Sequence, residues 1–135
     1  MLMQWNDALS SGVHEIDAQH QQLIGLVNGL IQSFDKESDQ SHNVTQIVQY
    51  LTDYVVFHFG AEEKHMATYG YPSMKAHVAQ HEQFVRTFLR LKDRIIQEGT
   101  HAELSADTKQ VVVDWLLNHI KYSDRALGMF LKLKM

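Results

Sequence analysis

The chain has 135 residues, of which 44% are apolar and 21% charged, and its formal net charge is -4. These values are typical of one soluble globular domain and exclude a disordered chain. The absence of cysteine excludes disulfides, thiolate metal sites and a cysteine nucleophile. No basic block favours nucleic-acid binding, and no apolar run or signal-peptide pattern indicates a membrane or export, so we expect a cytoplasmic protein.

Helical periodicity recurs four times after an N-terminal arm (residues 1–15) that contains Trp5. The predicted helices span about 16–36, 41–69, 73–98 and 105–132, and Ser41, Ser73 and Ser105 are the predicted N-caps of the last three. Short connections favour antiparallel neighbours. The sequence therefore predicts an all-α, up-down-up-down four-helix bundle that forms a single domain over 1–135. Gly25 and Gly29 in the first helix predict close packing against a neighbouring helix.

Six ionisable side chains interrupt the apolar faces of these helices, namely His20, His58, Glu62, His77, His81 and His119. Burial of such groups is costly unless they are paired or bind a metal. One buried histidine is usually just hydrogen-bonded. In an up-down-up-down bundle, however, the starts of the first and third helices meet the ends of the second and fourth, so all six fall at one end. Agreement in both face and depth indicates a metal site of imidazole and carboxylate ligands.

The spacing within the helices supports this interpretation at two places and leaves it open at a third. His58 and Glu62, like His77 and His81, are i, i+4 pairs that share a helix face. Asp124 follows His119 by five residues, which places it roughly 140° around a regular helix. Either Asp124 is a solvated surface residue, or the helix contains a π-bulge there. The surrounding sequence, HIKYSDRAL, fits both alternatives.

The remaining polar candidates have simpler interpretations. We expect His14, His42 and His101 to be solvated. We expect His65 to lie at the periphery of the site or to contact one of the metal-ligand residues without binding the metal. We expect Glu63 to be a surface residue at the wrong helical phase. Glu62-x-x-His65 matches the E-x-x-H motif of ferritin-like di-iron enzymes. The second copy that such a site needs, Glu98-x-x-His101, is interrupted by Gly99 and lies at the opposite end of the bundle, so a ferritin-like site cannot be built.

Nearly the whole chain resembles the hemerythrin-type domains of bacteria. The resemblance is carried by GVHEIDAQHQQLIGLVNGL, HFGAEEKHM, YGYPSMKAHVAQHEQF and WLLNHIKYSD. It implies a four-helix bundle with a non-haem di-iron centre that binds dioxygen reversibly. By position, one iron would be held by His77, His81 and His119, and the other, with an open coordination site, by His20 and His58. Glu62 and Asp124 would bridge the two irons together with a solvent-derived oxo or hydroxo group, which predicts distorted helical geometry between His119 and Asp124.

Four apolar residues near these positions would wall the oxygen site: Phe59, Trp115, Leu116 and Ile120. Ordinary bundle core explains them equally well. Five imidazoles and two carboxylates leave the irons less charge-compensated than the glutamate-rich ferritin-like sites, which favours reversible binding over further oxidation.

Three functional classes follow from this reading. The first is a non-enzymatic dioxygen-binding protein for carriage, storage or sensing, with a signalling domain as partner if the chain is part of a larger protein. The second is a di-iron redox enzyme that reduces nitric oxide or peroxide, for which Tyr122 is the nearest proton donor. The third is a metal-stabilised interaction domain.

Overall fold

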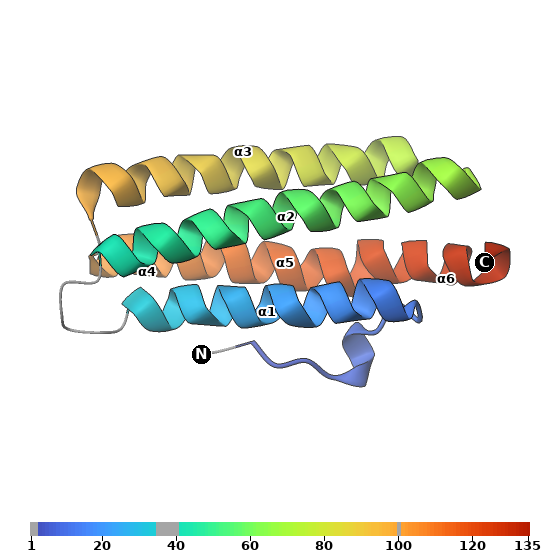
Figure 1. Cartoon of the computed structure of the whole chain (residues 1–135), viewed down its shortest axis with the longest axis horizontal. Helices are drawn as coiled ribbons and strands as arrows, with labels where there is room; N and C mark the ends of the chain where they lie inside the picture. Colours follow the sequence, from blue (N-terminus) through green and yellow to red (C-terminus); the bar gives the residue numbers. More distant parts are fainter. Residues whose placement is uncertain (1–2, 35–40, 100) are drawn as a thin grey trace.

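Four long helical rods lie side by side along the long axis of the molecule (Figure 1). The structure is a computed structural model that describes residues 3–34, 41–99 and 101–135, with the backbone alone for 41–43. The first three rods are α1 (His14–Phe34), α2 (Ser41–Tyr69) and α3 (Met74–Glu98). The fourth rod is composite: α4 (Ala102–Thr108), η2 (Lys109–Val113), α5 (Asp114–Asn118), η3 (His119–Asp124) and α6 (Arg125–Lys134).

Successive rods run in opposite directions, and the described residues contain no strand (Figure 1). The predicted all-α, up-down-up-down four-helix bundle is confirmed. Helices α1 and α2 pack together, as do α2 and α3, and α4 contacts both α1 and α3. None of the described helices combines the length and apolar character needed to span a lipid bilayer.

The apolar faces meet in two clusters along the bundle. The larger cluster runs from the middle of the rods to one end and includes Leu23, Phe59 and Ile120. The smaller cluster, at the other end, consists of Val13, Ile16, Met66, Leu127 and Leu131. In α1 the helical order is Ile16, His20, Leu23, and in α2 it is Phe59, Glu62, Met66. A polar layer is therefore enclosed between two apolar clusters.

The fourth rod begins at Ala102, three residues before the predicted start. The side chain of His101 is its N-cap, because Nδ1 accepts a hydrogen bond from the backbone N–H of Leu104 at 3.2 Å. The expectations that Ser105 opens this helix and that His101 is merely solvated were therefore wrong. Ser73 precedes α3 without a capping hydrogen bond. The predicted roles of the Ser41 and His42 side chains lie outside the described residues.

The N-terminal arm is fastened to α1 at two places. The side-chain amide of Asn28 exchanges two hydrogen bonds with the backbone of Met3, at 2.8 and 2.9 Å. Further along, the Asp17 carboxylate accepts hydrogen bonds from the hydroxyls of Ser10 and Ser11 and from the Ser11 backbone N–H. The arm includes the short 3₁₀ helix η1 (Asp7–Leu9) and runs along α1 before turning into it (Figure 1).

Gly128 in α6 is the point where this arm approaches the fourth rod. A Cβ atom built on Gly128 would lie 2.0 Å from the Ser11 carbonyl oxygen, far inside contact distance. A Cβ built on Gly25 or on Gly29 would meet no atom within 4 Å. The prediction that these two glycines permit close helix packing was therefore wrong, whereas Gly128 permits the close approach of the N-terminal arm to α6.

Replacing Gly128 with alanine should destabilise the protein by about 3 kcal/mol, because backbone atoms of the arm must move to admit the methyl group. The matched variant Gly25→Ala places the same methyl group on an exposed helical position and should stabilise the protein by roughly 1 kcal/mol through helix propensity. Urea denaturation of both variants measures the difference. Equal effects of the two substitutions would contradict the close approach of Ser11.

Candidate metal centre

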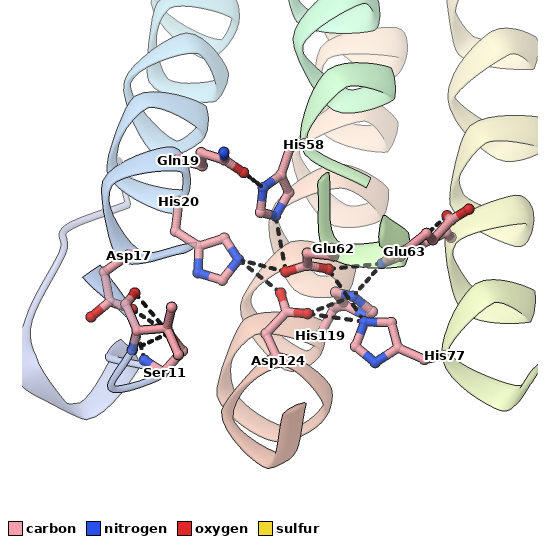
Figure 2. A network of polar contacts seen from close by, with 12 residues as sticks. Ser11, Asp17, Gln19, His20, His58, Glu62, Glu63, His77, His119 and Asp124 are labelled. Carbon is pink, nitrogen blue, oxygen red and sulfur yellow. Dashed lines mark hydrogen bonds and ion pairs between the residues drawn. The ribbon is translucent and has the colours of Figure 1, made fainter. Parts of the chain in front are cut away.

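Seven ionisable side chains meet in the polar layer between the two apolar clusters (Figure 2). All are buried, and all belong to the set predicted from the sequence. Helix α1 supplies one, α2 and α3 supply two each, and η3 supplies the last two: His20, His58, Glu62, His77, His81, His119 and Asp124. Each histidine turns its Nε2 atom toward the carboxylates.

The Glu62 carboxylate lies between two sets of histidines. Its Oε1 atom is 3.3 Å from Nε2 of His77 and 3.1 Å from Nε2 of His81. Its Oε2 atom is 3.3 Å from Nε2 of His58 and 3.5 Å from Nε2 of His20. One oxygen therefore faces the α3 histidines and the other faces the histidines of α1 and α2.

Asp124 repeats this arrangement from the fourth rod. Its Oδ1 atom is 3.1 Å from Nε2 of His77 and 3.2 Å from Nε2 of His119, while Oδ2 is 2.8 Å from Nε2 of His20. The ligand atoms fall into two groups that share both carboxylates. We call them the three-histidine group (His77, His81, His119) and the two-histidine group (His20, His58).

A π-helical segment brings Asp124 into the site. Residues His119–Asp124 form η3, in which hydrogen bonds join residues five apart and place them on one helix face. Of the two alternatives that the sequence left open, the solvated surface residue is wrong, and the distorted geometry implied by the resemblance is confirmed. The other π-helical segment, η2, was not predicted, and its contacts give no physical account of it.

Three histidines of the cluster form a hydrogen bond through Nδ1, the ring nitrogen that faces away from the cluster, to a side chain of a preceding helix. Nδ1 of His58 is 2.7 Å from Oε1 of Gln19, and Nδ1 of His81 is 2.9 Å from Oε2 of Glu63. Nδ1 of His119 is 2.9 Å from Oε1 of Gln80. Because oxygen atoms accept these bonds, each Nδ1 carries the proton and each Nε2 presents a lone pair to the centre.

This proton placement tests whether the residues fit a metal. Nε2 of His81 and Nε2 of His119 lie 3.1 Å apart, so two lone pairs face each other with no proton between them. Among the described residues, buried atoms without a hydrogen-bond partner include both ring nitrogens of His20, both oxygens of Asp124 and Oε2 of Glu62. Nε2 of His20 lies 2.8 Å from Oδ2 of Asp124, but neither atom has a hydrogen-bond partner. Buried acceptors that converge without donors suit a cation, and imidazole with carboxylate suits iron.

Glu63 was predicted to be a surface residue at the wrong helical phase, and it does lie outside the cluster of seven, but its contact with a cluster histidine was not predicted. Its side chain is 35% exposed, but it turns toward α3 and accepts the His81 hydrogen bond (Figure 2). Gln19 and Gln80 were missed altogether. All three partners lie next to a cluster residue in sequence, and each serves a histidine of the following rod. A polar residue adjacent to a predicted ligand was the available signal, because such a position flanks the neighbouring helix.

The other candidates occupy the margins of the site. His65 contacts Glu15 at 3.2 Å near the surface and does not reach the cluster, as expected. Phe59 stacks on His81 with a centroid separation of 3.8 Å, and Trp115 stacks on His119 at 4.4 Å. Leu116 and Ile120 are buried beside them in the larger apolar cluster. Tyr122 is 63% exposed and lines a surface groove that reaches His119.

Burial and charge shift the pKa values of the cluster in opposite directions. Burial acts to lower the pKa of His20 and His77, but contacts with Asp124 and Glu62 outweigh it and raise both to about 9. Burial acts to raise the pKa of Glu62, yet four histidines hold it well below its usual range. The pKa of Asp124 is likewise lowered, by His119 and His20, against burial and the Glu62 charge. Burial lowers the pKa of His119.

The metal-free protein should therefore lose stability as the pH rises from about 6.5 to about 9. A histidine whose pKa is raised by folding stabilises the protein fully below its unfolded pKa of about 6.5, and this contribution disappears as the pH passes the folded value. For His20 alone the loss is about 3 kcal/mol. The lowered pKa values of the carboxylates and of His119 act below this window. Melting temperatures of the metal-free protein between pH 6 and 9 measure the effect.

A His65→Asn variant should show the same decline, since it removes a histidine outside the cluster. A melting temperature that stays flat or rises between pH 6.5 and 9 would show that His20 and His77 are not proton-linked to the two carboxylates.

Comparison with known proteins agrees with this geometry. The family model described as the hemerythrin HHE cation-binding domain matches residues 11–131. A bacteriohemerythrin of Stenotrophomonas maltophilia is 33% identical over 125 residues, which cover 93% of this chain and 78% of the relative. A bacteriohemerythrin of Methylococcus capsulatus is 33% identical and is covered to 95%. A hemerythrin-like protein of Naegleria gruberi is 32% identical over 120 residues.

A crystal structure of a wild-type hemerythrin superposes with a TM-score of 0.85 and 31% identity, over 97% of this chain and 98% of the other. The family match covers more than half of the chain, and the relatives and the solved structure agree with it. The chain belongs to the hemerythrin family of HHE cation-binding domains.

Proposed function

We propose that this protein binds dioxygen reversibly at two non-haem irons, for oxygen carriage, storage or sensing. The observation that carries the proposal is the convergence of Nε2 lone pairs on two carboxylates that each face both histidine groups. Two groups of ligand atoms suit two cations, and membership of the hemerythrin family supports iron and dioxygen.

In this proposal the three-histidine group would hold one iron and the two-histidine group the other, with Glu62 and Asp124 as ligands shared by both groups. The group with fewer histidines has the fewer protein ligands and leaves a coordination position for dioxygen. When bound, the iron pair supplies the electrons and the open position that dioxygen binding requires. The protein residues hold the ions, orient the imidazoles and shield the site from water.

The apolar surroundings support reversible binding over enzymatic reduction. Reduction of nitric oxide or peroxide consumes protons, which a nearby acid has to deliver. Tyr122, the nearest candidate donor from the sequence, turns to the surface. Phe59, Leu116 and Ile120 are buried in the larger apolar cluster and would limit access of water and protons.

The direct test is iron content together with the visible absorption of the reduced protein before and after air. We expect two irons per chain, as the two groups of ligand atoms require, and a colour that appears with oxygen and reverses when oxygen is removed. Rapid, irreversible conversion to a ferric form would contradict reversible binding and favour redox chemistry. If the purified protein takes up no iron when it is reconstituted with iron, the di-iron proposal itself is contradicted.

His119→Ala should reduce iron content below two per chain and abolish the oxygen-dependent colour, because it removes a ligand from the three-histidine group. The matched control is His65→Ala, which removes a histidine at the margin of the same end of the bundle. Metal analysis after gel filtration compares the two. Full iron content and full oxygen binding in His119→Ala would show that the assignment of ligands is wrong.

A further inference from the structure

The outer hydrogen bonds of the two histidine groups differ in charge. Gln19 and Gln80 offer neutral amide oxygens to His58 and His119. Glu63 offers a carboxylate to His81. The only anionic outer contact among these three therefore belongs to the three-histidine group. An anionic acceptor polarises the imidazole more strongly than an amide, because hydrogen bonds to charged acceptors are about twice as strong.

Two contacts fix the orientation of the His81 ring. On one face, Phe59 stacks on the ring with an interplanar angle of 3°. At the ring edge, Nδ1–H donates to Oε2 of Glu63. The stack sets the plane of the ring, and the hydrogen bond sets its rotation and tautomer, so that Nε2 points into the cluster.

Glu63 and His81 line the same surface groove between α2 and α3. The groove has a volume of about 430 Å³, and its lining also includes Phe59, Glu82 and Arg86. The partial exposure of Glu63 lets its carboxylate remain hydrated on one side while it binds the buried imidazole on the other. A negative charge is thus kept at the edge of the site without the cost of full burial.

We propose that Glu63 is a positioning residue that holds His81 as an Nε2 ligand and, through its negative charge, lowers the reduction potential of the metal in the three-histidine group. The charge stabilises the ferric state more than the ferrous state, since the ferric ion carries the larger positive charge. In the described residues, the outer hydrogen bond of the two-histidine group runs from His58 to the neutral amide of Gln19, and Asp17 acts on His20 through charge without a hydrogen bond. The two irons would therefore differ in potential even though both carboxylates are shared. This inference rests on the proposed di-iron function.

The test compares Glu63→Gln, Glu63→Ala and the control Glu82→Gln, which removes a charge from the same groove at an exposed residue. Glu63→Gln keeps an acceptor oxygen and should retain both irons while its reduction potential rises, by about 59 mV for each tenfold change in the ferric-to-ferrous preference. Glu63→Ala loses the hydrogen bond as well and should bind metal about 10- to 100-fold more weakly. Glu82→Gln should match the unmodified protein in both measurements.

Metal affinity is measured by competition with a chelator using Co²⁺, whose absorption reports ligation without any oxygen chemistry. Potentials are measured on the iron-loaded proteins by a redox titration. The reciprocal variant Gln80→Glu places a carboxylate behind His119, where Oε1 already accepts from His119 and from Ser123, and should lower the potential.

Unchanged potential in Glu63→Gln, or an equal rise in Glu82→Gln, would overturn the role of the Glu63 charge. Unchanged Co²⁺ affinity in Glu63→Ala would overturn its positioning role. Circular dichroism establishes that each variant retains its helices. Failure of the unmodified protein to bind two irons would instead contradict the proposed function, so the two failures are distinguishable.

Discussion

The structure depends on a cluster of buried hydrogen-bond acceptors. Five imidazole Nε2 atoms and four carboxylate oxygens converge in the middle of a bundle whose remaining interior is apolar. Charged groups in such surroundings are costly unless compensated. In the metal-free protein, the raised pKa values of His20 and His77 favour their protonated, positively charged forms, which provide part of that compensation. A bound cation would replace those protons and satisfy oxygens that have no donor, and would thereby couple metal binding to folding.

The outer hydrogen bonds of the cluster histidines connect each helix to the next. Gln19 on α1 accepts a hydrogen bond from His58 on α2, and Glu63 on α2 accepts one from His81 on α3. Gln80 on α3 accepts one from His119 on the fourth rod. Each of these bonds needs the relative rotation of two neighbouring helices to be correct. They therefore link the orientation of the ligands to the packing of the bundle, and they determine which ring nitrogen faces the centre.

Of the two π-helical segments in the described residues, η3 lies at the site. In η3 the π-helical turn brings Asp124 beneath the histidines, and one turn later Gly128 admits the backbone of Ser11. The arm, held by Asp17 and Asn28, thus packs directly beside η3, the segment that carries Asp124. The smaller apolar cluster lies on one side of the polar layer and the larger apolar cluster lies on the other.

The sequence by itself determined the bundle, the alternating direction of its helices and six of the seven cluster residues, because a 3.6-residue period fixes which side chains share a face, and antiparallel order fixes their depth. Spacing alone did not decide Asp124, since a regular helix would turn it outward; the resemblance and then the π-helical geometry did. Only the tertiary structure revealed the roles of Gln19, Glu63, Gln80 and Gly128 and the capping by His101. These roles depend on the distance and rotation between elements, and the periodicity within one helix carries no information about either.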